Sequence, residues 1–364
     1  MCRSTPESPL ANFARVRLHA LTPLLLSLLT ACGGGDPERS AALPASTDTA
    51  RRTVLAVEPS PPWLMQFDAG EYLAPSADGQ SAVLQGGDVA NDTASSYPGA
   101  LSVQYQGGNA DQRIAEVVAD PSDPGNRVLQ FRLREANVSD SSGLPVKGRV
   151  QLNAYNVEPT TARELRFSSR MFLASDIDLL RQMRATFDWL TLSEWWNDAG
   201  WTGQAYPFRV SIDIVKVSSR KGSPLNFRAS AQTLDPVTQN WKRTVWQITN
   251  RSVQVPTGRW VTLEYAYLEG NASTGRFYMA MTPDGGARTV LFDVRSWTHH
   301  PDDPAPDGLT HVNPLKLYTS KQVIDHVRNA GGTLSVYWDD LAFRLCRDRQ
   351  PEESSPCAPA SFGS

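Results

Sequence analysis

Two segments of the chain carry polar side chains at a spacing of two. In the first, Arg149, Gln151 and Asn153 alternate with Val150 and Leu152. Successive side chains of a β-strand point to opposite faces, so the three polar groups are expected to share one face. Arginine binds carboxylates through charge-assisted hydrogen bonds, and amides can add further ones. This face is a candidate site for an acidic ligand, although an ordinary solvent-facing strand has the same pattern.

The second segment lies near the C-terminus, where Lys316 and Tyr318 share one face. Tyrosine can act as an acid or a base, so Tyr318 is the preferred candidate for proton transfer. The preceding segment holds three of the five histidines, His299, His300 and His311. Its Pro, Asp and Gly content is typical of an irregular loop beside a site. We expect His299 and His311 to contact a substrate; the alternative for the adjacent pair is a plain surface position.

Four tryptophans surround an acidic residue in the middle of the chain: Trp189, Trp195, Trp196 and Trp201 lie close to Glu194. Aromatic faces bury the apolar face of a sugar ring well. Core packing explains Trp189 and Trp195 equally well. We expect Trp196 and Trp201 to be exposed on a loop and, with Glu194, to bind substrate.

Strands must position these residues, because the alternation of apolar and polar residues recurs along the chain. It is clearest in five segments: 129–134, 210–214, 261–267, 277–281 and 334–338. Turn signals separate the segments, and short helices are expected only at 176–184 and 321–329. Many short strands with few helices and no internal repeat favour an all-β fold, a two-sheet antiparallel β-sandwich, over a closed barrel.

Three segments resemble a known family of sandwiches. They begin with Gly258-Arg-Trp, Thr274-Gly-Arg-Phe and Val336-Tyr-Trp-Asp-Asp. They are similar to concanavalin A-like jelly rolls, in particular to polysaccharide lyases of the heparin lyase I and alginate lyase type. The resemblance covers roughly residues 127–344. It implies a jelly-roll sandwich and cleavage of an acidic polysaccharide by β-elimination.

The resemblance also implies roles for the residues above. The catalytic candidates are Tyr318 as acid/base, with Arg149, Gln151 and Lys316. The substrate-binding candidates are Asn153, Glu194, Trp196, Trp201, His299 and His311. The chain lacks the histidine of the family's Q-I/V-H motif, and also the E-x-D-x-x-E signature of laminarinase-like glycosidases. A glycan-binding lipoprotein without catalysis and an envelope scaffold that binds a protein therefore stay open as alternatives.

The N-terminal residues have the parts of a secretion signal. A basic leader precedes the apolar segment 18–31, which is shorter than the roughly 20 residues of a membrane-spanning helix. The segment ends in Leu29-Thr-Ala-Cys32, which resembles the bacterial lipobox. We therefore expect a signal peptide over 1–31 and lipidation of Cys32. A flexible tether would follow over 32–62, and the anchor would place the protein in the cell envelope, on the outer membrane.

The remaining expectations concern the sandwich domain (63–345) and the tail (346–364). Cys346 and Cys357 in an exported chain favour a disulfide that holds the tail. Asp339 and Asp340 could join the turn at 68–71 in a structural calcium site, although a charged strand end is the plainer interpretation. No other metal or cofactor is expected. A formal net charge of −3 without a basic cluster argues against nucleic-acid binding. The expected partner is an anionic polysaccharide, bound by a monomer.

Overall fold

The computed structural model describes residues 63–86, 101–155, 162–197, 205–235, 241–306, 308 and 311–347. All of them belong to one unit of the chain, 56–364. The predicted signal peptide, Cys32, the tether, Trp201 and Cys357 lie outside the described residues, and so does the side chain of Cys346.

Eight strands form one antiparallel sheet, in the order β16-β15-β14-β9-β18-β6-β5, with β1 paired to β18. Their bounds are β1 Trp63–Met65, β5 Arg113–Ala119, β6 Arg127–Leu133, β9 Ala162–Leu173, β14 Trp260–Leu268, β15 Arg276–Pro283, β16 Thr289–Arg295 and β18 Leu334–Arg347. The long strands β9 and β18 pair at the centre of this sheet.

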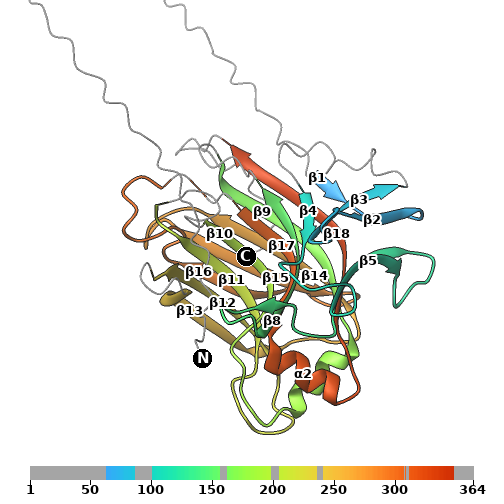
Figure 1. The fold of residues 1–364 in the computed structure, drawn as a ribbon. Helices are drawn as coiled ribbons and strands as arrows, with labels where there is room; N and C mark the ends of the chain where they lie inside the picture. Colours follow the sequence, from blue (N-terminus) through green and yellow to red (C-terminus); the bar gives the residue numbers. More distant parts are fainter. Residues whose placement is uncertain are drawn as a thin grey trace, which may run out of the picture. The chain divides into compact units, whose positions relative to one another are not determined.

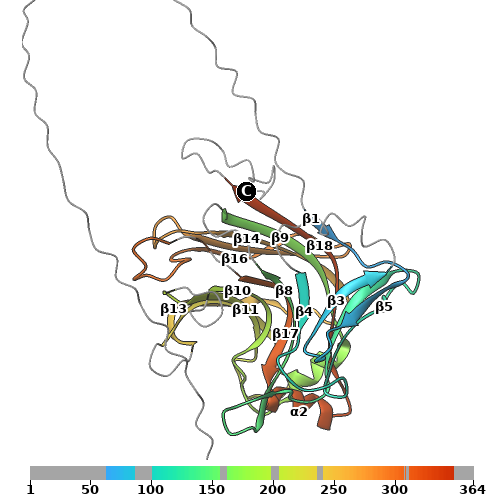
Figure 2. The same cartoon turned by 45° about the horizontal axis from the view of Figure 1, so that its top comes forward.

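Ten strands form the second antiparallel sheet, in the order β13-β12-β11-β10-β17-β8-β4-β3-β2, with β7 paired to β8. Their bounds are β2 Glu71–Pro75, β3 Ser81–Gly86, β4 Leu101–Gln104, β7 Val138–Ser139, β8 Pro145–Tyr155, β10 Leu190–Asn197, β11 Phe208–Val215, β12 Asn226–Leu234, β13 Trp241–Gln254 and β17 His311–Ser320. Figure 1 shows both sheets, and Figure 2 shows them as two layers, with β9, β14, β16 and β18 in one and β8, β10, β11 and β17 in the other. The predicted β-sandwich is confirmed.

The core lies between the two sheets and contains the apolar half of each alternating strand. Trp195 of β10 is completely buried there. Its ring lies 5.3 Å from that of Phe167, 5.4 Å from that of Tyr265 and 5.1 Å from that of Phe277, between ring centroids. Three aromatic residues of the facing sheet thus fix β10, and core packing is the correct explanation for Trp195.

Both expected helices are present. The first, expected at 176–184, is a 3-10 helix, η2 (Ser175–Gln182), and the second is an α-helix, α2 (Lys321–Asn329). The hydroxyl of Ser320 accepts a hydrogen bond from the backbone N–H of Val323, which caps the start of α2. Helix α2 therefore begins directly where β17 ends. No helix among the described residues has the length and apolar character that a membrane crossing requires.

Candidate functional site

The ten-stranded sheet carries polar side chains on the face that points away from the core, which we call the polar face. On its central strands the apolar residues of each alternation are buried in the core, so the polar residues between them point outward. The polar face includes Lys147, Arg149, Gln151, Asn153, Trp189, Thr191, Glu194, Trp196, Arg209, Ser211, Asp213, His311, Asn313, Lys316 and Tyr318.

Strands β8 and β17 are direct neighbours and bring the two predicted segments together. In their register Gln151 lies opposite Lys316, and Arg149 lies opposite Tyr318. The guanidinium carbon of Arg149 and the amino nitrogen of Lys316 each lie 5.1 Å from the centroid of the Tyr318 ring. The expected shared faces are therefore confirmed, while the catalytic roles of these residues stay predictions.

Glu194, from β10, forms the centre of a buried ion cluster on this face. One of its carboxylate oxygens accepts a hydrogen bond from Arg209 at 2.9 Å, and the other accepts one from Lys316. The amino group of Lys316 also donates to the side-chain oxygen of Asn313 at 3.2 Å. Glu194 is 6% exposed and Lys316 is 1% exposed, so both charges are almost removed from solvent.

Burial and charge act on the two pKa values in different ways. Burial raises the pKa of Glu194, but the positive charges of Lys316 and Arg209 outweigh it and lower this pKa to about 2. Burial lowers the pKa of Lys316 to about 8, because the attraction of Glu194 does not fully compensate it and Arg149 adds repulsion. Glu194 is therefore an anion at neutral pH that holds a lysine in place.

An amide chain runs along the same face beside this cluster. Gln151 donates to the side-chain oxygen of Asn153 at 2.7 Å, and Asn313 donates to that same oxygen. The indole N–H of Trp196 donates to the side-chain oxygen of Asn313 at 3.0 Å. The ring centroid of His311 lies 5.1 Å from that of Trp196. The predicted binding residues Asn153, Trp196 and His311 are thus connected to one another.

Two of these positions differ from the expectation. Trp196 and His311 were expected on loops, but both belong to strands, since β10 ends at Asn197 and β17 begins at His311. In the register they lie opposite each other, which explains their ring contact. The residues around Trp196 and His311 in the sequence are typical of loops, but strand pairing at the centre of the sheet outweighs this local preference.

Trp189 belongs to the polar face and not to the core. Its ring is half-buried and lies 4.7 Å from the ring of Tyr318, between centroids. The amino nitrogen of Lys147 lies 5.9 Å from the same tyrosine ring. The ring of Trp189 and three cationic side chains, Lys147, Arg149 and Lys316, therefore surround the Tyr318 ring, an arrangement that suits a sugar ring carrying an anionic group.

The sequence did not single out Arg209 and Asp213 of β11 for the site. Asp213 is 5% exposed and accepts hydrogen bonds from the hydroxyls of Thr191, at 2.6 Å, and Ser211, at 3.0 Å. Burial raises the pKa of its carboxyl group, against these hydrogen bonds. The sequence feature that could have indicated them is the alternation of Arg209, Ser211 and Asp213 with Val210. It resembles the alternation in the Arg149 segment.

His299 lies in a network of its own loop. Its Nδ1 atom and the backbone oxygen of His300 are 2.8 Å apart, and its ring meets that of Trp297 edge-on at 5.1 Å. The ring nitrogen of His300 accepts a hydrogen bond from the backbone N–H of Asp302 at 3.1 Å. The expected contact of His299 with a substrate stays a prediction.

Asp339 and Asp340 of β18 are the residues predicted to contribute to a structural calcium site. Asp339 accepts a hydrogen bond from Asn126 at 3.1 Å and lies 3.9 Å from Arg170, while Asp340 accepts one from Gln66 at 2.6 Å. In the described part of the chain, no three or more His, Cys, Asp or Glu side chains are grouped closely enough to hold a metal ion. A calcium ion at this place stays a prediction.

Comparison with protein families and with curated proteins gives no match. Solved structures similar to the chain include alginate lyases and a glucuronan lyase. A mutant of alginate lyase Aly36B in complex with alginate tetrasaccharide has a TM-score of 0.43 at 12% identity, with 80% of this chain and 100% of that chain covered. A marine alginate lyase from Aplysia kurodai has a TM-score of 0.44 at 8% identity, with 79% and 99% covered.

An endo-β-1,4-glucuronan lyase from the fungus Trichoderma reesei has a TM-score of 0.37 at 14% identity, with 70% of this chain and 98% of that chain covered. At such identities and scores, neither site residues nor an activity carry over to this chain. The polar face must therefore be judged by its own geometry.

Proposed function

We propose that this protein binds an acidic polysaccharide across the polar face and cleaves it by β-elimination. One observation carries this proposal: Arg149 and Tyr318 lie opposite each other on neighbouring strands, with the guanidinium 5.1 Å from the ring. A guanidinium, which is a good ligand for carboxylates, and a phenol, which can transfer protons, are thus adjacent, as elimination beside a carboxylate requires.

The charges of the polar face favour an anionic ligand. Among the polar-face residues named above, the cationic side chains are Lys147, Arg149, Arg209 and Lys316, and the carboxylates are Glu194 and Asp213. Glu194 is already paired with two of these cations. The excess of positive charge at a partly water-excluded surface attracts the carboxylates of a polyuronate chain and raises its local concentration.

In the proposed reaction, Arg149 and Gln151 hold the carboxylate of one uronate residue and stabilise the charge that develops there. Deprotonated Tyr318 takes the proton from C5. The electron pair left behind forms the C4–C5 double bond while the bond from C4 to the glycosidic oxygen breaks. The hydroxyl of Tyr318 then returns the proton to that oxygen. The products are a chain with an unsaturated uronate end and a chain with a new hydroxyl group.

The packing of Tyr318 favours a second candidate function, the binding of a glycan without cleavage. The Tyr318 ring is held between Trp189, Arg149 and Lys316. Such a ring offers a stable surface for a sugar even if its hydroxyl takes no part in chemistry. The two candidates share the ligand and differ in the fate of the glycosidic bond.

The test mixes the purified protein with polyuronates and glycosaminoglycans and follows ultraviolet absorbance, which rises when an unsaturated uronate forms. We expect a rising signal with at least one acidic polymer and a loss of at least a hundredfold in Tyr318→Phe, since a positioned acid/base contributes roughly 10²–10⁴-fold. Tyr337→Phe is the matched control. That residue is also half-buried and packed against an aromatic ring, but on the other sheet.

A Tyr318→Phe variant as active as the parent would refute the assignment of the acid/base. If no polymer is cleaved while one acidic polymer binds and Arg149→Gln weakens that binding, the protein is a glycan-binding protein. If no acidic polymer binds, the proposed function is wrong in both forms.

We further propose that the protein is attached to the outer membrane of a bacterial cell envelope through a lipid on Cys32. The support is the motif Leu29-Thr-Ala-Cys32 after a short apolar segment. Metabolic labelling with a radioactive fatty acid tests it in a bacterial host. We expect label in the parent and none in Cys32→Ser; a labelled variant would contradict the proposal.

A further inference from the structure

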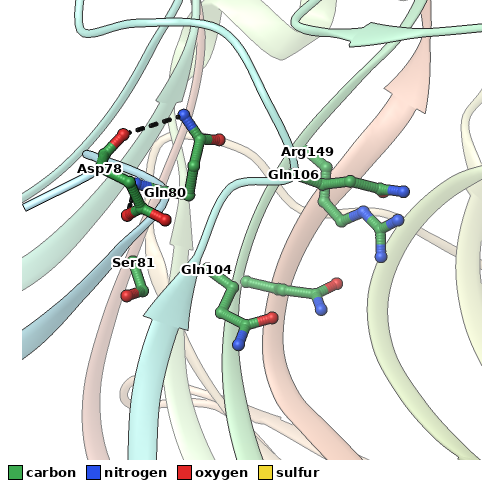
Figure 3. A pocket seen from close by; sticks show the side chains of 7 residues that line it. Asp78, Gln80, Ser81, Gln104, Gln106 and Arg149 are labelled. Carbon is green, nitrogen blue, oxygen red and sulfur yellow. Dashed lines mark hydrogen bonds between the residues drawn. The ribbon is translucent and has the colours of Figure 1, made fainter. Parts of the chain in front are cut away.

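A pocket of about 250 Å³ lies beside the polar face, between the β2–β3 turn and the loop that follows β4. Gln151 and Arg149 of β8 form its inner wall, and both are register partners of site residues on β17. Figure 3 shows Asp78 and Gln80 on one side of the pocket and Arg149 on the other. The pocket therefore adjoins the place where we position a uronate carboxylate.

Buried hydrogen bonds hold the two loops of this pocket together. The guanidinium of Arg113, only 5% exposed, donates to the backbone oxygens of Gly79 at 2.8 Å, Gly107 at 3.0 Å and Gly108 at 2.9 Å. It also lies 3.7 Å from the centroid of the Tyr105 ring. One buried cation thus joins the β2–β3 turn to the loop after β4, and the walls are preformed.

Asn137 fixes the same loop to β8. Its side-chain nitrogen donates to the backbone oxygens of Tyr105 at 2.9 Å and Gly107 at 3.1 Å, and its oxygen accepts from the backbone N–H of Arg149 at 2.9 Å. Gln106, which lines the pocket, has a φ of 62°, a conformation that residues other than glycine rarely adopt. Strained non-glycine residues of this kind cluster at active sites and ligand-binding loops.

The lining of the pocket is rich in amides. Four glutamines contribute, namely Gln80, Gln104, Gln106 and Gln151. The side-chain oxygen of Gln151, a residue 2% exposed, is buried and has no hydrogen-bond partner among the described residues. A buried acceptor without a partner destabilises the fold, and a hydroxyl donor from a ligand would relieve this cost.

Asp78 makes the outer wall negative. Hydrogen bonds from the hydroxyl of Ser76 and the backbone of Gln80 lower the pKa of its carboxyl group, so it is charged at neutral pH. A carboxylate repels a second carboxylate but accepts hydrogen bonds from hydroxyl groups. The pocket is also smaller than the roughly 300–1,000 Å³ of sites for drug-sized ligands. Its chemistry and size suit a single uncharged sugar residue.

We propose that this pocket binds one uncharged, hydroxyl-bearing sugar residue of the same polysaccharide whose uronate lies at Arg149. The preferred substrate is then a heteropolymer in which uronates are joined to uncharged sugars, and a homopolymer of uronates fits less well. This inference rests on the proposed function. Gln104 of β4 and Lys316 of β17 flank Gln151 in the sheet, so they lie roughly 10 Å apart by the usual strand spacing.

The test compares binding of two kinds of oligosaccharide by isothermal titration. Hyaluronan and gellan fragments contain uncharged sugars beside glucuronate, while alginate and polyglucuronate fragments contain uronates alone. We expect the parent to bind a heteropolymer at least tenfold more tightly. Gln104→Leu removes an amide that lines the pocket and should weaken heteropolymer binding at least tenfold, with less than a twofold effect on homopolymers. Gln85→Leu is the matched control, because Gln85 is exposed on β3 outside the pocket.

Gln106→Gly provides a second variant that relieves the positive φ while it removes an amide. It should fold at least as stably as the parent and bind heteropolymers more weakly. If homopolymers bind as tightly as heteropolymers, or if Gln104→Leu weakens both equally, the pocket proposal is wrong while the proposed function stands. If no acidic oligosaccharide binds, the proposed function itself fails and the pocket proposal fails with it.

Discussion

The ion cluster around Glu194 leads to a prediction about stability. Glu194→Gln removes the carboxylate and leaves Lys316, which is 1% exposed, without its counter-charge. Breaking a buried ion pair at one side costs about 3–5 kcal/mol, because the remaining charge is buried without compensation. Since Lys316 also faces the positive charges of Arg149 and Arg209, we expect Glu194→Gln to lose about 4 kcal/mol of unfolding free energy.

The double variant Glu194→Gln/Lys316→Met distinguishes the cost of an unpaired buried lysine from the net contribution of the ion pair to stability. It removes both charges and replaces the lysine by an apolar chain of similar length. Replacing a buried ion pair by apolar groups is often nearly neutral. Arg209 also donates to Gln232 at 2.6 Å, so it keeps a partner. We therefore expect the double variant to lose about 1–2 kcal/mol, less than Glu194→Gln alone.

Urea unfolding of the parent, both single variants and the double variant measures these free energies. We expect a coupling energy of at least about 2 kcal/mol between the two positions. If the double variant loses the sum of the two single losses, Lys316 is not stabilised by Glu194, and our description of the cluster is refuted.

The same variants have distinct pH dependences. The folded pKa of Glu194, about 2, is below its ordinary value of 4.5, so its contribution is complete above pH 4.5 and is lost as the pH falls toward 2. The folded pKa of Lys316, about 8, is below its ordinary value of 10.5, so the unfolded chain binds more protons between these values. Stability therefore rises with pH from about 8 to 10.5. Both trends should be absent from the double variant.

Three further predictions concern other parts of the fold. Arg113→Lys cannot reach all three glycine carbonyl groups, and we expect a loss of about 1–3 kcal/mol in urea unfolding together with weaker heteropolymer binding; an unchanged affinity would contradict its role in shaping the pocket. Burial raises the pKa of Asp339 to about 6, so its charged form destabilises the fold above pH 6 and this cost disappears near pH 4. Asp339→Asn should thus stabilise the protein at pH 7 by about 1–3 kcal/mol and not at pH 4, whereas a loss of stability in calcium-containing buffer would indicate the predicted calcium site instead. Trp195→Ala should lose about 3–5 kcal/mol and Trp196→Ala much less, as thermal unfolding would show; equal losses would contradict their assignment to opposite faces of β10.

Local patterns explain what could be predicted from the sequence. The alternation of polar and apolar residues placed Arg149 on one face with Gln151, and Lys316 on one face with Tyr318. Side chains two positions apart in a regular strand point to the same face. The bounds of α2 agreed with the expected 321–329, since Ser320 caps its start and Gly331, with a φ of 84°, follows its end. Where a strand is irregular, this alternation does not show which side chains point toward the core. Strand β10 is bulged between Thr191 and Glu194, so the sequence alone did not place its tryptophans.

The pairing of strands was decided by the tertiary structure alone. Glu194 and Lys316 are 122 positions apart and meet only because β10 and β17 are neighbours in the sheet. Arg209 joins them through β11, although its own segment gave the same alternating signal as the Arg149 segment. No local rule ranks one polar strand face above another, because each looks like an ordinary solvent-facing surface.

The pocket could not be predicted from the sequence. Its walls come from a turn and a loop without periodic pattern, and their positions depend on hydrogen bonds from Arg113 and Asn137 to backbone oxygens. Any residue can supply a backbone oxygen, so such contacts leave no trace in residue types. The sequence by itself determined the strand faces and the kinds of chemical group available for a site. Only the tertiary structure, through long-range strand pairing and contacts to the backbone, decided which of these groups meet.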